Sequence, residues 1–170
     1  MKKILLAVIV LVTFASCQEQ KIGFIDNAKV INDIQEKKDV ESKYDVLNES
    51  FKKRADSLGK SYQSEYLALQ SKMARMSQSK QQEAGQAFQA KAQQFQQMMQ
   101  AEQQQLQTAY QADIDSVISK MKVTVKDFGK TNGYKFIIGA NESTANILYG
   151  DETLDLSDVI IKEIDAKYKK

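Results

Sequence analysis

Apolar and aromatic side chains recur at steps of three and four residues along a proline-free stretch that runs from about Asn27 to Lys130. This spacing predicts helix, and its repetition over many turns is typical of a coiled coil. The first half of the stretch carries Tyr44, Leu47, Phe51, Ala55, Leu58, Tyr62, Tyr66, Leu69, Met73 and Met76. The second half repeats the pattern with Phe88, Ala92, Phe95, Met99, Leu106, Ala109, Ile114, Val117, Met121, Val125 and Phe128.

The apolar pattern is interrupted between Met76 and Phe88, and this interruption divides the helical stretch into two arms of similar length. We therefore predict an antiparallel helical hairpin that turns near Ser77–Lys80, or as late as Gly85. No Gly-Pro or Asn-Gly pair marks the turn, so a single unbroken helix is the alternative.

Short segments with a strand pattern flank the helical stretch. Residues 21–26 are typical of a strand, and Asp26 at its end can accept the free N–H groups of the following helix as an N-cap. After a helix stop at 129–133, residues 134–139 and 145–149 have the pattern of two strands around a turn. This arrangement predicts a β-hairpin.

The C-terminal end predicts one more helix, which Asp155 can cap. Its apolar face would carry Val159, Ile160, Ile164 and Tyr168. The predicted fold class is α+β: a long antiparallel helical hairpin, or coiled-coil tentacle, on a small β-rich oligomerisation body with a short C-terminal helix. Three strands and a short helix make too small a core to be independently stable, which favours self-association.

The N-terminus has the order of a signal peptide: basic Lys2-Lys3, then an apolar run from Ile4 to Phe14 that is too short to span a bilayer. The following Phe14-Ala15-Ser16-Cys17 resembles a bacterial lipobox, in which the chain is cut before the cysteine and the thiol carries a lipid. We therefore predict lipidation of Cys17, the only cysteine of the chain. Because Gln18 is not Asp, the common sorting rule would place such a lipoprotein at the outer membrane. An ordinary secretory leader with an incidental Cys17 is the alternative.

These segments divide the chain into a signal peptide at 1–16, a lipidated N-terminus with the first body strand at 17–26, the helical hairpin at 27–130, and the β-hairpin with the C-terminal helix at 131–170. Fifty residues of helix span about 75 Å. Each arm of the predicted hairpin would therefore project far beyond a small body.

Composition excludes several kinds of chemistry. The 170 residues include no His and one Cys, so zinc sites, Cys/His nucleophiles, Ser-His-Asp triads and a disulfide within the chain are excluded. We predict no enzyme activity, no metal site and no cofactor. The 24 basic residues are nearly balanced by 22 acidic ones, which argues against general nucleic-acid binding.

The charge and polarity of the hairpin are uneven. From Lys52 to Lys80, seven residues are basic and two are acidic, which would attract acidic partners or anionic lipid head groups. Between Gln78 and Gln111, 15 of 34 residues are Gln, which favours helix and gives a neutral polar surface. A solvated coiled-coil face is the alternative explanation for both features.

A seam only two helices wide cannot bury every large apolar side chain, and Met suits surfaces that fit many partners. The candidate binding residues combine this apolar set with the basic charge. They are Phe51, Lys52, Lys53, Arg54, Met73, Arg75, Met76, Phe88, Phe95, Met98 and Met99. Packing within the seam is the alternative role of the apolar members.

The two ends of the chain carry a family resemblance. The residues concerned are Lys21-Ile22-Gly23-Phe24-Ile25-Asp26, Gly133-Tyr134-Lys135-Phe136-Ile137-Ile138, Ile147-Leu148-Tyr149-Gly150 and Leu154-Asp155-Leu156-Ser157-Asp158-Val159-Ile160. With the long helical stretch between them, they resemble the Skp (OmpH) family of periplasmic chaperones. The resemblance covers the chain from about Lys21, and its ends are the specific part.

The resemblance implies a homotrimer whose β-rich body carries helical tentacles around a cavity that holds unfolded outer-membrane β-barrel proteins without ATP. By the same resemblance, residues 21–26, 134–139 and 147–149 would be body strands, and the helical stretch would be the tentacle. The family's best-known members are soluble and strongly basic, whereas this chain is nearly neutral and carries a lipobox-like leader.

Two functions from different classes follow. The first is an ATP-independent holdase of the cell envelope, in the periplasm and anchored to the outer membrane through Cys17. The second is a lipid-anchored coiled-coil scaffold that binds one folded partner, for which the basic and Gln-rich surfaces would only provide solvation.

Overall fold

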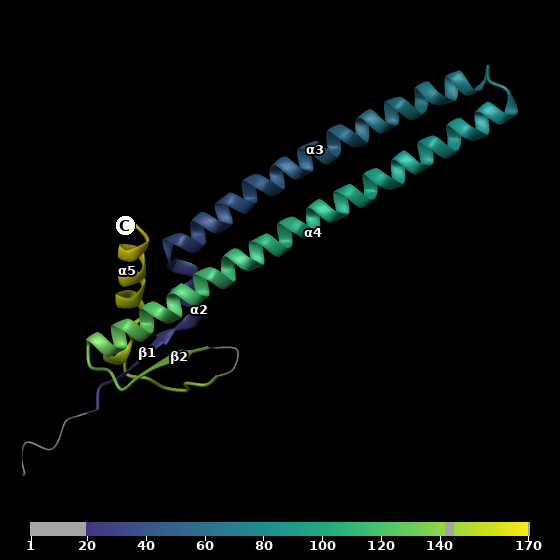
Figure 1. The fold of residues 1–170 in the computed structure, drawn as a ribbon. Helices are drawn as coiled ribbons and strands as arrows, with labels where there is room; N and C mark the ends of the chain where they lie inside the picture. The colour runs from purple at the N-terminus through teal and green to yellow at the C-terminus, as the bar shows by residue number, and fades with distance from the viewer. Residues whose placement is uncertain (1–19, 142–144, 170) are drawn as a thin grey trace, which may run out of the picture. The chain divides into compact units, whose positions relative to one another are not determined.

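A computed structural model describes residues 20–141 and 145–169, so the predicted signal peptide and Cys17 lie outside the described residues. The elements are β1 (Ile22–Asp26), α2 (Asn27–Asp33), α3 (Gln35–Met73), α4 (Gln78–Thr131), β2 (Phe136–Ala140), a 3-10 helix η1 (Glu152–Leu154) and α5 (Ser157–Tyr168) (Figure 1). The chain forms two compact units. The sheet unit combines the described residues up to Ile34 with those from Ser119 onward, and the hairpin unit comprises residues 35–118.

The sheet unit contains a two-stranded parallel sheet of β1 and β2. The register pairs Ile22 with Phe136 at one end and Asp26 with Ala140 at the other. A parallel pair needs a long crossover, and here the helices between the strands supply it. The predicted strands at 21–26 and 134–139 are thus found with shifted ends, but they pair with each other.

The predicted β-hairpin is wrong, because residues 145–149 form no strand. The side chain of Asn146 explains the difference: its amide donates to the carbonyl oxygen of Gly139 at 2.7 Å, and its Oδ1 accepts the N–H of Asn141 at 2.8 Å. These side-chain bonds take backbone groups at the end of β2 and replace a strand ladder there. Leu148 and Tyr149 are consequently 91% and 85% exposed.

The core of the sheet unit forms where α2 and α5 pack on each other and on β1. Its buried apolar side chains are Ile25, Val30, Ile34, Met121, Leu156, Ile160 and Ile164. Asp26 caps α2 as predicted, because its carboxylate accepts the N–H groups of Ala28 and Lys29 at 2.9 and 3.0 Å. Asp155 lies one residue before the cap position of α5 and accepts the N–H of Ser157 at 2.8 Å.

Helix α4 ends at Thr131, which confirms the helix stop predicted at 129–133. Just after this end the backbone conformation requires glycine. Gly133 adopts a φ of +73°, which side-chain-bearing residues rarely take. The next N–H, from Tyr134, returns to the carbonyl oxygen of Gly129 at 2.9 Å and satisfies one of the last carbonyls of the helix.

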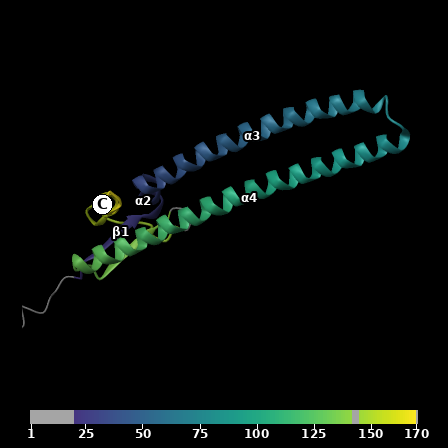
Figure 2. The same ribbon diagram turned by 45° about the horizontal axis from the view of Figure 1, so that its top comes forward.

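The hairpin unit confirms the predicted helical hairpin and excludes a single unbroken helix, because α3 and the N-terminal part of α4 run antiparallel, side by side, in both views (Figures 1 and 2). The turn occupies residues 74–77, slightly before the predicted position, and Gly85 lies inside α4. Gln81 helps to fix this position, since its side-chain amide donates to the carbonyl oxygens of Met73 and Met76 at 2.9 and 3.0 Å. Helix-end carbonyls without such partners would need water.

The helical stretch also breaks once near its start, which the apolar pattern does not predict. Ile34, between α2 and α3, is extended, with φ −66° and ψ 139°, and it is fully buried. Among residues 20–141 and 145–169, the structure contains no helix that combines the length and apolar character needed to cross a membrane.

Candidate functional site: the surface of the helical hairpin

The seam between α3 and α4 consists largely of aromatic contacts. The rings of Tyr62 and Phe95 stack with centroids 4.9 Å apart, and Phe88 lies 6.1 Å from Tyr62 and 5.5 Å from Tyr66. These pairs confirm the predicted seam. It is shallow, however, because no residue between Tyr44 and Val117 in the chain is fully buried.

The structure places the apolar candidate residues on or beside this seam. Most are half-buried, namely Phe51, Met73, Met76, Phe88, Phe95 and Met99, whereas Met98 is 51% exposed. The basic candidates Lys52, Lys53, Arg54 and Arg75 are all exposed. Their role in binding stays a prediction, since contacts within the seam account for part of the apolar set.

Arg54 has a partner that explains an irregularity of the sequence pattern. Glu102 interrupts the apolar seam on α4, and Arg54 on α3 forms an ion pair with it across the hairpin. Arg54 also donates to Ser50 Oγ at 3.1 Å. Lys52, in contrast, pairs only loosely along its own helix, 3.6 Å from Glu49.

A polar cluster that the sequence pattern does not predict lies at the end of the hairpin unit away from the turn. Lys43 Nζ and the Tyr44 hydroxyl both donate to Asp113 Oδ2, at 2.8 and 3.0 Å. The hydrogen bond from Lys43, followed by that from Tyr44, lowers the pKa of Asp113. Burial and then the same hydrogen bond raise the pKa of Tyr44. These residues lie about 70 positions apart, so only the register of the folded hairpin brings them together.

A further ion pair across the hairpin lies closer to the turn than the pairs of Lys43 and Arg54. Lys91 Nζ contacts both carboxylate oxygens of Glu65, at 2.8 and 2.5 Å, and this hydrogen bonding raises the pKa of Lys91. The Tyr62 hydroxyl donates to the Lys91 carbonyl oxygen at 3.1 Å. Polar contacts thus join the two arms within the aromatic seam as well as at the end of the hairpin unit away from the turn.

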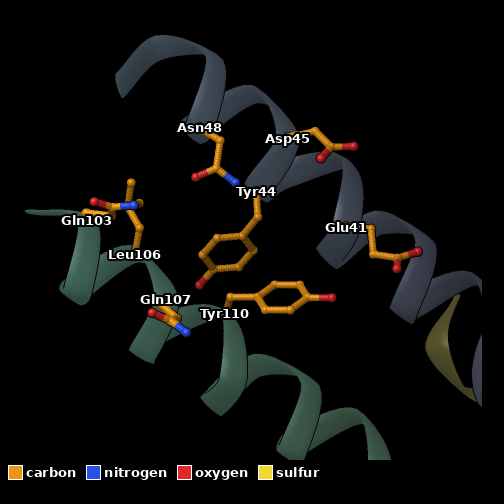
Figure 3. A pocket seen from close by; sticks show the side chains of 8 residues that line it. All are labelled: Glu41, Tyr44, Asp45, Asn48, Gln103, Leu106, Gln107 and Tyr110. Atoms are coloured by element: carbon orange, nitrogen blue, oxygen red, sulfur yellow. The ribbon is translucent and has the colours of Figure 1, made fainter. Parts of the chain in front are cut away.

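A groove of about 580 Å³ opens beside the first of these clusters, and we name it the tyrosine groove (Figure 3). Its lining residues are Glu41, Tyr44, Asp45, Asn48, Gln103, Leu106, Gln107 and Tyr110. Figure 3 shows Tyr44 and Tyr110 between the two helices, and their rings meet edge to face at 5.2 Å. Amide and carboxylate groups lie beside these rings and Leu106, so the lining is part polar and part apolar and its charged members are acidic.

Nearer the turn, a smaller groove of about 340 Å³ has a different lining, and we name it the alanine groove. It is formed by Glu65, Ala68, Leu69, Lys72, Ala84, Ala87, Phe88 and Lys91. Only Phe88 among these belongs to the predicted binding residues. The small Ala side chains gave no signal in the sequence, because Ala in a helix is ordinarily read as a helix former.

The sheet unit presents a separate apolar surface. Phe136 and Ile138 alternate along β2 and are 61% and 44% exposed, and Leu148 and Tyr149 are more exposed still. A small unit that exposes this much apolar area is expected to bury it against a partner. Within the described residues, no group of three His, Cys, Asp or Glu side chains could hold a metal ion.

Comparison with known proteins agrees with this architecture. No curated protein matches the sequence. Among solved structures, a candidate outer membrane chaperone (OmpH-like) from Caulobacter crescentus superimposes with a TM-score of 0.77 and 14% sequence identity. The match covers 87% of this chain and 85% of that one, and at this identity it shows the shared fold. The profile of the OmpH-like outer membrane protein family matches residues 21–164, so this chain belongs to the OmpH-like family.

Proposed function

We propose that this chain is an ATP-independent holdase chaperone of the cell envelope. It would bind unfolded outer-membrane β-barrel proteins between the hairpins of a homotrimer and would catalyse no reaction. Membership of the OmpH-like family and the shared fold with a candidate outer membrane chaperone support this proposal. The observation that carries it is the shallow hairpin seam, which leaves Phe, Met and Tyr side chains half-exposed over residues 45–116.

Such a surface suits weak binding to many sequences. An unfolded β-barrel protein offers alternating apolar and polar side chains, and the hairpin offers the same mixture in half-exposed form. The exposed Lys52, Lys53 and Arg75 add positive charge that would attract acidic segments of the client. No contact would need to be strong, because many contacts along two long helices act together.

The homotrimer would form through the sheet unit. Its two-stranded sheet is smaller than a stable isolated sheet requires, and the apolar side chains of Phe136, Ile138, Leu148 and Tyr149 are exposed. Association of three copies would cover these side chains. Light scattering at micromolar concentration tests this directly, since a mass equal to one subunit would remove the trimer.

Anchoring at the outer membrane would follow from lipidation of Cys17 after removal of residues 1–16. Two or more acyl chains hold a protein at a membrane, whereas one chain binds reversibly. Mass spectrometry of the protein from native membranes tests this step. A mature chain that lacks Cys17, or that carries it with a free thiol, would exclude the anchor.

The holdase activity itself is tested by aggregation. A β-barrel protein is diluted from urea with and without a stoichiometric amount of this protein, and turbidity is followed without nucleotide. We expect suppression by the full chain and none by an equal mass of serum albumin. Equal precipitation in both samples would reject the holdase and leave the lipid-anchored scaffold with a folded partner.

A further inference from the structure

The alanine groove has a regular construction. On α3 its residues follow the spacing Glu65, Ala68, Leu69 and Lys72, and α4 repeats this i, i+3, i+4, i+7 spacing from Ala84 to Lys91. Each helix therefore turns one continuous face toward the groove. Leu69 and Phe88 are half-buried and form its apolar floor.

The ring of Phe88 is held in place from the seam side. Tyr62 and Tyr66 contact it at centroid distances of 6.1 and 5.5 Å. In the groove that Phe88 lines, positions 68, 84 and 87 are all Ala, beside the larger side chains of Leu69, Lys72 and Lys91. The result is a half-buried aromatic ring that packs on two tyrosines and lines a space of about 340 Å³, within the range of about 300–1,000 Å³ typical of ligand clefts.

The two lysines at the rim of the groove differ in whether an acidic side chain neutralises them. Lys91 is neutralised by its ion pair with Glu65 at one end of the groove. Lys72, at the other end, is exposed and has no ion pair among the residues that the structure describes. The groove therefore combines an apolar, partly aromatic floor with one uncompensated positive charge.

We propose that the alanine groove binds an aromatic side chain of an unfolded client in which the neighbouring residue is acidic. The aromatic ring would lie on Leu69 and against the groove-lining ring of Phe88, in the edge-on or offset geometry that aromatic pairs favour. The acidic neighbour would approach Lys72. This inference rests on the proposed holdase function and names one class of client segment that the hairpin selects.

The tyrosine groove cannot serve the same segment. Glu41 and Asp45 at its edge would repel a carboxylate, and amide groups of Asn48 and Gln107 replace the Ala side chains. Of these two grooves, only the alanine groove is therefore expected to select an aromatic residue with an acidic neighbour.

The test uses the full chain and three rhodamine-labelled peptides that differ at two central residues: Phe-Asp, Phe-Lys and Ala-Asp, each flanked by Gly and Ser. Fluorescence anisotropy measures their affinities. We expect the Phe-Asp peptide to bind about fivefold or more tightly than each of the others. Equal affinities for the three peptides would overturn the proposal.

Two variant pairs locate the site. Ala87→Leu fills the groove and is expected to weaken Phe-Asp binding about tenfold, whereas Ala90→Leu, an exposed position of the same helix outside the groove, should change it less than about twofold. Lys72→Glu should abolish the preference for Asp over Lys, and Lys80→Glu, with the same charge change outside the groove, should retain it. Unchanged binding by Ala87→Leu or an unchanged preference in Lys72→Glu would overturn the site.

The aggregation assay on the same variants separates this proposal from the holdase proposal. If the protein suppresses aggregation but does not select the Phe-Asp peptide, the alanine groove is rejected and the holdase stands. If the peptide binds as expected but the client precipitates, the groove stands as a peptide site and the holdase is rejected.

Discussion

Ser157 connects the end of β1 to the start of α5 through a fully buried hydroxyl group. Its Oγ accepts the backbone N–H of Asp26 at 2.8 Å and donates to Asp155 Oδ1 at 2.5 Å. In Ser157→Ala, the Asp26 N–H would lose its acceptor in a place that water reaches poorly. Asp155 would keep the N–H of residue 157, so the start of the helix itself is retained.

The loss of stability expected for Ser157→Ala follows from this unpaired N–H group. Leaving a buried donor without a partner costs about 1–3 kcal/mol, more than the net value of an ordinary hydrogen bond. Loss of one oxygen atom adds little cavity volume. Chemical denaturation by urea at fixed protein concentration, followed by circular dichroism, should show this loss in the free energy of unfolding.

Amide exchange gives a local readout of the same bond. If the Asp26 N–H opens more readily by about 1–3 kcal/mol, its hydrogen exchange accelerates by about fivefold to 150-fold. Ser119→Ala on the exposed surface of α4 is the matched control and should stay within about 0.5 kcal/mol. An unchanged exchange rate at Asp26 together with unchanged stability in Ser157→Ala would refute the reasoning.

Three further results are expected. The hydrogen bond from Lys43 lowers the pKa of Asp113 in the folded state, so the ionised Asp113 stabilises the fold fully above its unfolded pKa of about 3.9. This stabilisation is lost as the pH falls through the lower folded pKa. Thermal melting should therefore show less acid destabilisation below about pH 4 in Asp113→Asn than in the native chain. Ile160→Ala removes a fully buried side chain and should cost about 2–5 kcal/mol in urea denaturation, whereas the nearly half-exposed Val159→Ala should cost about 0.5 kcal/mol or less. Tyr149→Ser should lower the mass measured by light scattering at low micromolar concentration without loss of helical circular dichroism, and an unchanged mass would remove this side chain from the proposed trimer contact.

Features with a strong local cause could be predicted from the sequence. The seam residues repeat every three or four positions, so the placing of Tyr62, Phe88 and Phe95 on the facing sides of the two arms follows from helical periodicity. The cap of α2 by Asp26 follows from the chemistry of one side chain and the adjacent N–H groups. The hairpin itself follows from the interruption between the two seams.

Features that depend on distant partners could not be predicted in the same way. Residues 145–149 have the residue pattern of a strand. The side chain of Asn146, however, forms hydrogen bonds with the backbone at the end of β2, and the segment does not join the sheet. The turn begins before Ser77 because Gln81 satisfies the last carbonyls of α3, and Gln is no ordinary turn signal. The pairing of Lys43 with Asp113 needs the register of both arms.

The distribution of burial connects this fold to the proposed function. A holdase must bind many segments without opening its own core, because opening would cost stability at each binding event. In the hairpin, Phe88 packs on two tyrosines and also lines the alanine groove, so a client side chain could bind there with the arms closed. The buried side chains that maintain the sheet unit, such as Ile160 and Val30, are fully covered and take no part in this surface. Client contact and subunit stability can therefore rest on different residues of the same chain.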